Sequence, residues 1–233
     1  MNHVGGRPRA RDTIARLMRI LMLSARDAAP GERVHALAAA LVAAGHLVDL
    51  IASEQPGLRA GNSDELRLVT VPEYPPLVPT TDRLAWALQL NAGMLERSTQ
   101  LGEAARYDIV HAHDWETAWA AAATKNLFEL PLVSTLHVVE PVADDESKLI
   151  SQAEWWLTYE SRRTIVPSDA LRRRIEDAFE LPVDKQIVIL DDLSPAEQAA
   201  RTAAAYEEAI ADDLERGEVR PPLRVILGRS QKP

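Results

Sequence analysis

The sequence predicts an α/β fold with a single Rossmann-like, doubly wound and mainly parallel sheet of six or seven strands. Short apolar runs of strand length alternate with longer segments that have helical periodicity. Such alternation favours parallel pairing, right-handed crossovers and helices on both faces of the sheet. The hydrophobic content of 46% over 233 residues is normal for a packed globular chain, and the length suits one large domain or two small ones.

The first third of the chain carries three of the expected strands. An apolar run over residues 19–24 is long enough for a buried strand. A helical pattern with one apolar face follows over residues 34–42, and Gly45 is a typical residue to end that helix. Two more strands are expected at residues 47–52 and 67–71.

The alternation repeats through the middle of the chain. Four prolines between residues 72 and 79 exclude regular structure there, and a long helix is expected over residues 81–105. Asp114 and Ser168 are predicted to cap helices that end near residues 128 and 179. One further helix is expected at residues 145–160, and four further strands at residues 108–112, 132–136, 163–166 and 186–190.

A last helix has an explicit start signal. Ser194 can cap it, Pro195 suits its first position, and Glu197 completes a capping box, so we expect a helix that ends before Gly217. The chain then divides into a basic extension expected to be disordered, the main domain, a packing helix, and a short strand resembling the first element of a further domain. These parts are residues 1–18, 19–193, 194–217 and 218–233.

Composition excludes several classes of function. Acidic residues outnumber basic ones by 35 to 26, which gives a net charge of −9, so the chain is a poor general binder of nucleic acid. No apolar run approaches the ~18 residues of a membrane span, and a cytoplasmic location is expected by default. The absence of cysteine excludes disulfides, thiolate metal sites and a thiol nucleophile.

Three common nucleotide and hydrolase signatures are also missing. No G-x-G-x-x-G follows the first strand, which argues against a dinucleotide enzyme. No G-x-x-x-x-G-K-[ST] is present, and no G-x-S-x-G elbow occurs, so a P-loop NTPase is excluded and an α/β-hydrolase is disfavoured.

Polar side chains follow several of the expected strands at the point where each strand ends. In an open parallel sheet, ligands bind outside the carboxyl ends of the strands, near the point where the strand order reverses. Separate strands therefore deliver histidines and carboxylates to one rim, which favours a small-molecule cleft. The residues are Asp27, His113, Asp114, Glu116, His137, Glu140 and Ser168.

Each candidate also has a structural interpretation. His111 is interpreted as a core histidine, whereas His113 and His137 are interpreted as functional because they stand at strand ends. A metal held by His111, His113 and either Asp114 or His137 is an alternative, but no recognised ligand spacing supports it, and no metal is expected. Two further groups are interpreted structurally, Trp155, Trp156 and Tyr159 as core and Arg172, Arg173 and Arg174 as a solvated face.

Four segments together resemble a known family. Residues 107–119 (YDIVHAHDWETAW) resemble the strand–turn–helix signature of family 4 and related GT-B glycosyltransferases, especially the glycogen and starch synthase branch. Residues 131–137 (PLVSTLH), 154–168 (EWWLTYESRRTIVPS) and 181–190 (LPVDKQIVIL) resemble the elements that follow in that fold. With the first strand and the turn at Gly45, the resemblance spans residues 19–190.

The resemblance implies the N-terminal half of a GT-B fold, in which two Rossmann-like domains enclose the active site. It implies that the N-terminal domain mainly holds the acceptor, such as an α-glucan. The C-terminal domain then holds the nucleotide sugar, such as ADP- or UDP-glucose, as co-substrate of a retaining hexosyl transfer. By this analogy His113 and Asp114 lie near the transferring sugar, and His137 lines the acceptor side. The remaining substrate-binding assignments are Gly31, Glu116, Glu140 and Ser168.

Three departures from the family pattern shape the functional hypothesis. The loop after the first strand offers only Gly31 where paired glycines are usual, and residues 191–193 (DDL) replace an Asn-Gly hinge. Arg229 and Lys232 are the only remnants of a donor diphosphate site. We therefore expect an acceptor-binding half that is incomplete alone and works with a separate donor-domain polypeptide or as a homodimer. The alternatives are a degenerate, non-catalytic carbohydrate-binding or interaction module and a different small-molecule function on a Rossmann-like sheet.

Overall fold

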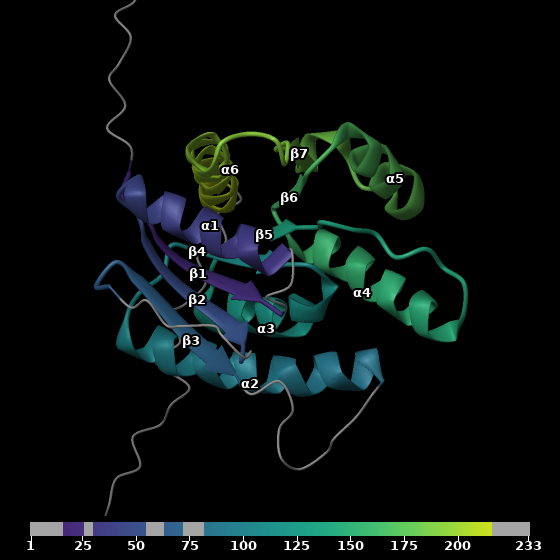
Figure 1. Cartoon of the computed structure of the whole chain (residues 1–233), viewed down its shortest axis with the longest axis horizontal. Helices are drawn as coiled ribbons and strands as arrows, with labels where there is room; N and C mark the ends of the chain where they lie inside the picture. The colour runs from purple at the N-terminus through teal and green to yellow at the C-terminus, as the bar shows by residue number, and fades with distance from the viewer. Residues whose placement is uncertain (1–15, 26–29, 55–62, 72–81, 216–233) are drawn as a thin grey trace, which may run out of the picture.

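A computed structural model describes residues 16–25, 30–54, 63–71 and 82–215. Most of the expected N-terminal extension (residues 1–15) and the whole of the expected C-terminal strand (residues 218–233) lie outside the described residues. Figure 1 shows one central sheet with helices packed above and below it.

In the described residues the sheet has seven strands in the order β3-β2-β1-β4-β5-β6-β7, and every neighbouring pair is parallel. The prediction of a doubly wound parallel sheet is confirmed. The strand order reverses between β1 and β4, so the switch point that favours ligand binding lies at the carboxyl ends of these two strands. The strands are β1 Arg19–Ser24, β2 Leu47–Ser53, β3 Leu66–Val71, β4 Ile109–His113, β5 Leu132–Thr135, β6 Arg163–Val166 and β7 Gln186–Val188.

Six α-helices and two short 3-10 helices cover the sheet in the described residues. Helices α1 and α6 pack on one face, and α2, α3 and α4 pack on the other (Figure 1). The helices are α1 Pro30–Ala43, α2 Arg83–Ala104, α3 Ala118–Phe128, α4 Asp145–Glu160, α5 Asp169–Phe179 and α6 Pro195–Glu215, with η1 Trp115–Thr117 and η2 Val183–Lys185.

Strand β1 shows why the sequence requires cover on both sides. Ile20 and Met22 point into the cluster formed with α1 and α6, whereas Leu21 and Leu23 point into the cluster formed with α2, α3 and α4. Because successive side chains of a strand point to opposite faces, a continuous apolar run is stable only between two helical layers.

Helix α6 is an integral part of this packing. Its inward face buries Tyr206 completely, and the Tyr206 hydroxyl lies 2.7 Å from Nδ1 of His111 on the central strand β4. At its far end, Arg162 and Arg163 before and in β6 form ion pairs with Asp213 and Asp212. The helix therefore covers the sheet face between α1 and β6 and does not stand free.

Most local signals of the sequence act as expected. Gly45 ends α1 with a φ of 95°, in the left-handed region that favours glycine. The Ser168 hydroxyl accepts a hydrogen bond from the Leu171 amide at the start of α5. At the start of α6, Ser194 and Glu197 form the reciprocal capping box. The caps at Ser168 and Ser194 fix the helix starts at the carboxyl edge of the sheet, whereas Gly45 ends α1 at the opposite edge, before β2.

The expectation that the aromatic residues of α4 belong to the core is wrong for two of the three. Trp155 and Tyr159 are 45% and 63% exposed and stack on each other with ring centroids 5.5 Å apart. Only Trp156 packs against the core, near Trp119. The buried residues of α4, such as Leu157, form its inward face. Trp155 and Tyr159 lie on the other side of the helix because of the helical period.

Candidate functional site

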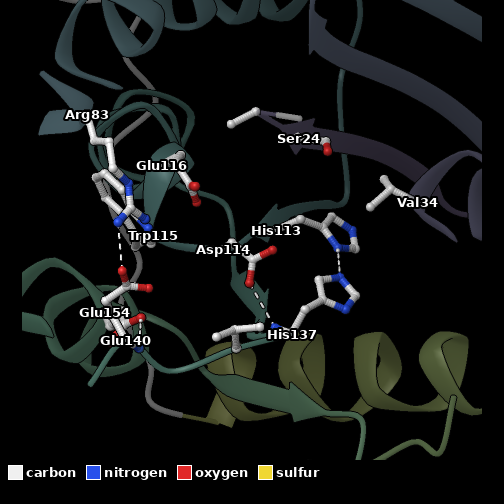
Figure 2. A pocket seen from close by; sticks show the side chains of 12 residues that line it. Ser24, Val34, Arg83, His113, Asp114, Trp115, Glu116, His137, Glu140 and Glu154 are labelled. Carbon is white, nitrogen blue, oxygen red and sulfur yellow. Dashed lines mark hydrogen bonds and ion pairs between the residues drawn. The ribbon is translucent and has the colours of Figure 1, made fainter. Parts of the chain in front are cut away.

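A cavity of about 190 Å³ opens at the carboxyl ends of β1, β4 and β5, beside the switch point of the sheet. Figure 2 shows side chains from β4, η1, α2, α4 and the loop after β5 converging on it. Five of the residues expected from the sequence line this cavity together, namely His113, Asp114, Glu116, His137 and Glu140. The other lining residues are Ser24, Ala25, Val34, Arg83, Trp115, Val138 and Glu154.

The remaining expected residues lie elsewhere or beyond the described parts. Ser168 is not among the lining residues, and its hydroxyl caps α5. Gly31 is the second residue of α1, and Val34 of the same helix lines the cavity. Asp27, Arg229 and Lys232 fall outside the described residues.

His111 is a core residue, as interpreted from the sequence. Its Nδ1 lies 2.7 Å from the Tyr206 hydroxyl and its Nε2 lies 2.8 Å from the Thr135 hydroxyl, so both ring nitrogens have partners. Burial lowers the pKa of His111 to about 3, and a small contribution from His137 acts in the same direction. A neutral, fully hydrogen-bonded imidazole is a packing element that ties β4 to β5 and α6.

His113 and His137 form a pair on one wall of the cavity. Their rings are stacked, and Nδ1 of His113 lies 3.4 Å from Nε2 of His137 (Figure 2). Burial lowers the pKa of His137 to about 4, and burial together with the neighbouring histidines lowers the pKa of His113 well below its ordinary value. Both rings are therefore neutral at pH 7. The outer nitrogens, His113 Nε2 and His137 Nδ1, are buried without a hydrogen-bond partner.

Asp114 holds the turn between β4 and η1 against the end of β5. The sequence predicts that its side chain caps the following helix, but that prediction is wrong, because Oδ1 accepts instead from the His137 amide at 2.8 Å. Its own amide donates to the Thr135 carbonyl at 2.9 Å. Its backbone has φ 60° and ψ 168°, a conformation almost restricted to glycine. Strain of this kind persists where the surroundings fix it, and it clusters at functional sites.

The opposite wall of the cavity consists of carboxyl groups and one guanidinium. Arg83, the first residue of α2, places Nη1 2.6 Å from Oε1 of Glu140 and lies over the ring of Trp115. Glu154 on α4 is 1% exposed, and its Oε1 accepts a hydrogen bond from the Glu140 amide at 2.9 Å (Figure 2). Burial, followed by nearby carboxylates, raises the pKa of Glu154 to about 8.

Three further residues line the cavity that the sequence did not indicate as functional, namely Arg83, Trp115 and Glu154. Trp115 and Glu154 lie within the segments that resemble the glycosyltransferase family, but the resemblance assigns neither of them a role. One signal for Glu154 was present, because it occupies the apolar stripe of α4 between Ile150 and Leu157. A carboxyl group on the buried face of a helix is rare unless it has a partner or a function.

A smaller hollow lies behind the histidine pair, towards α6. It shares Val34, His113 and His137 with the main cavity, so these three side chains lie between the two spaces. Arg33 and Asp191, which line it, form an ion pair that connects α1 to the segment after β7. The partially buried histidine pair thus has hollow space on two sides.

Within the described residues, no group of three or more histidine, aspartate or glutamate side chains is arranged to hold a metal ion. No helix in the parts of the chain that the structure describes has the length and apolar character to cross a membrane.

The chain is similar to members of one family. The family model for glycosyltransferase family 4 matches residues 31–190. An uncharacterized glycosyltransferase from Methanocaldococcus jannaschii is 30% identical over 171 residues, which cover 69% of this chain and 41% of that protein. Glycogen synthase from Mycobacterium tuberculosis is 31% identical over 168 residues, which cover 64% of this chain and 41% of the enzyme. The chain thus spans about two fifths of the length of these relatives.

Solved structures share the fold at low sequence identity. One structure of sucrose-phosphate synthase from Thermosynechococcus elongatus gives a TM-score of 0.62 at 16% identity. The alignment covers 82% of this chain and 98% of that one. The catalytic domain of starch synthase IV from Arabidopsis thaliana, bound to ADP and acarbose, gives a TM-score of 0.54 at 18% identity. The alignment with starch synthase covers 75% of this chain and 52% of that one.

Proposed function

The chain belongs to glycosyltransferase family 4, and from that premise we propose that its cleft binds the acceptor of a hexosyl transfer. The acceptor is a neutral carbohydrate such as an α-glucan, and the co-substrate is a nucleotide sugar such as ADP- or UDP-glucose. Two relatives support this choice, because one is a glycogen synthase and the other is a starch synthase crystallised with ADP and acarbose.

The observation that carries the proposal is the chemistry of the cavity wall. The lining residues include four carboxyl groups and two neutral imidazoles, and Arg83, the one lining guanidinium in the described residues, is bound to Glu140. A diphosphate needs cations and amide donors, so this wall disfavours the donor's pyrophosphate. Hydroxyl groups, by contrast, both donate to carboxylates and accept from acids and imidazoles. The cavity therefore suits a hydroxyl-rich, uncharged ligand.

The proposed roles follow from position. His113 and Asp114 end the central strand β4 and lie next to the transferring sugar, while His137, at the end of β5, lines the acceptor side. A neutral imidazole with a free nitrogen can hold an acceptor hydroxyl in place or accept its proton. The charge that develops on the leaving diphosphate is then stabilised by groups outside this cavity, in a donor-binding lobe.

Binding and turnover test this proposal separately. The 233-residue chain is expected to bind maltotriose in titration calorimetry and to transfer no glucose from ADP-glucose or UDP-glucose to it when assayed alone. His113→Ala is expected to weaken maltotriose binding by about tenfold, the effect of one lost hydrogen bond in an enclosed site. Rapid transfer by the isolated chain would contradict the assignment of the donor site to another lobe.

A non-catalytic binding module is the second candidate. Gly31 lies in the first turn of α1 and is the single glycine of the segment where related transferases carry a pair, which favours a site that binds without catalysis. If a donor-lobe polypeptide restores transfer and His113→Ala leaves the restored rate unchanged, the cleft acts in binding or assembly only.

A further inference from the structure

Glu154 has an unusual environment for a carboxyl group. It projects from the inward face of α4 into the cavity wall and is 1% exposed (Figure 2). Oε1 accepts a hydrogen bond from the Glu140 amide, whereas Oε2 is buried and has no hydrogen-bond partner. A buried polar atom without a partner costs free energy, so a natural protein that keeps one points to a ligand that satisfies it.

The charged groups that face Glu154 favour its neutral form. Asp114 at the end of β4, Glu116 on η1 and Glu140 after β5 all carry like charge, and each acts to raise the pKa of Glu154. Among the described lining residues, Arg83 on α2 is the one Lys or Arg, but its guanidinium pairs with Glu140 and its backbone amide donates to Glu146. A buried carboxylate without a counter-ion of its own takes up a proton.

The position of that proton follows from the hydrogen bonds. Oε1 already accepts from a backbone N–H, so the hydroxyl of the neutral acid lies on Oε2. The cavity wall therefore presents an O–H donor whose acceptor must come from outside the protein.

We propose that neutral Glu154 donates a hydrogen bond from Oε2 to a hydroxyl oxygen of an uncharged sugar ring, and so defines a subsite that rejects phosphorylated sugars. The subsite consists of Arg83, Trp115, Glu140 and Glu154 and faces the histidine pair across the cavity. The inference rests on the proposed function for the class of its ligand, and it assigns to Glu154 a contact that the family resemblance does not.

The charge of the subsite explains the expected selectivity. With Glu154 neutral, Asp114, Glu116 and Glu140 still leave an excess of negative charge over Arg83 at the cavity wall. A phosphate group would meet this excess at short range in a partly dehydrated space, where like charges repel strongly. A sugar hydroxyl carries no charge, accepts from Glu154 and donates to a neighbouring carboxylate.

Two variants test whether Glu154 acts as a neutral hydrogen-bond donor or as a charged acceptor. Glu154→Gln keeps a donor of similar shape, so maltotriose affinity at pH 6.5 is expected to stay within about threefold of the wild type, whereas Glu154→Leu loses about tenfold. Glu96→Gln, at an exposed site on α2, is the control and should change nothing. Glucose should bind the wild type at least about tenfold more tightly than glucose 6-phosphate, because of the charge of the wall.

The pH profile of binding gives an independent readout. Maltotriose affinity of the wild type is expected to fall as the pH rises from 7 to 9 and Glu154 ionises, and the Gln variant should lose this dependence. The cleft histidines do not titrate in this interval, because their pKa values lie well below it. The ¹³C carboxyl shift of Glu154 follows the same ionisation, and saturating maltotriose should raise its pKa further.

Each outcome decides the matter. Tight wild-type binding with an unaffected Leu variant, or equal losses in the Gln and Leu variants, would overturn the role of Glu154 and leave the acceptor cleft standing. Absence of maltotriose binding by the wild type would overturn the proposed function and this subsite with it. If the Leu variant fails to fold, as circular dichroism would show, the pH profile of Glu154→Gln decides alone, and a profile like that of the wild type refutes the inference.

Discussion

A carboxyl group is buried near each end of the sheet, and the two groups differ in their hydrogen-bond partners and in the direction of their pKa shifts. Near the amino-terminal end, Asp49 of β2 is 2% exposed and receives hydrogen bonds from Arg19, Arg67 and the Tyr107 hydroxyl. At the carboxyl end, Glu154 receives one backbone N–H and keeps a buried oxygen without a partner. Burial opposes the ionisation of Asp49, but the three hydrogen bonds outweigh it and lower its pKa.

The contrast separates a stabilising site from a binding site. Every polar group around Asp49 belongs to the protein, so the cluster joins β1, β2, β3 and the start of β4 and has no need of a ligand. The described part of the cavity wall, in contrast, contains three buried polar atoms without partners, on His113, His137 and Glu154. Unsatisfied groups cost stability, and proteins keep them where binding compensates for the loss.

The largest expected effect is a difference in pH dependence between these two carboxyl groups. The raised pKa of Glu154, about 8 against an ordinary 4.5, means that its contribution to stability is complete below pH 4.5 and is lost as the pH rises towards 8. The lowered pKa of Asp49 has the opposite sign, so its contribution is present above the unfolded-state pKa and is lost as the pH falls below about 4.

Urea unfolding at pH 5, 6, 7 and 8 measures how the contribution of Glu154 to the free energy of unfolding depends on pH. Relative to Glu154→Gln, the wild type should lose up to about 1.4 kcal/mol of unfolding free energy for each pH unit over this interval. A difference that stays constant with pH would show that Glu154 is ionised in the folded protein and would remove the distinction between the two sites.

The next effect in size concerns Asp49. Asp49→Asn leaves two guanidinium groups without their carboxylate, a change that costs about 3–5 kcal/mol when the whole cluster is buried. Arg19 and Arg67 are 30% and 39% exposed and can regain water, so we expect a loss of about 2–3 kcal/mol in urea unfolding at pH 7. At the same pH Glu154→Gln should be neutral or stabilising. Equal losses in the two variants would mean that both carboxyl groups serve the fold.

A third effect tests whether strain is confined to the carboxyl end. Asp114 adopts φ 60° and ψ 168°, whereas no such backbone occurs at Asp49. Asp114→Gly should therefore be about 1–2 kcal/mol more stable than Asp114→Ala, since glycine relieves the strain while both variants lose the hydrogen bond to the His137 amide. Thermal unfolding of the two variants provides the comparison, and equal stabilities would argue against backbone strain at this turn.

These contrasts also explain how far the sequence could predict the structure. Strand and helix bounds depend on apolar periodicity and on caps such as Gly45 and Ser168, which act over a few residues. The gathering of His113, Asp114 and His137 was predictable because each follows a strand, and parallel strands end at one edge.

The charged cavity residues that the sequence did not predict come from helices and not from strand ends. Arg83 and Glu154 come from α2 and α4, whose positions over the strand ends depend on tertiary packing that no local pattern encodes. The aromatic pair of Trp155 and Tyr159 shows the same limit, because an apolar side chain on a helix can face either core or solvent. Only the helical phase relative to Leu157 and Ile150 distinguishes the two cases.

The smallest effect is expected at Ser168, which tests the contrast within the carboxyl end itself. Its position after β6 suggests substrate binding. Its hydroxyl, however, accepts a hydrogen bond from the Leu171 amide, so the side chain has a partner within the protein. Ser168→Ala should cost about 1 kcal/mol of stability in urea unfolding, the usual value of a lost helix cap. Maltotriose affinity should stay unchanged, in contrast to Glu154→Leu. If Ser168→Ala weakens maltotriose binding as strongly as the cleft variants do, a hydrogen-bond partner within the protein does not distinguish structural from binding residues at this edge of the sheet.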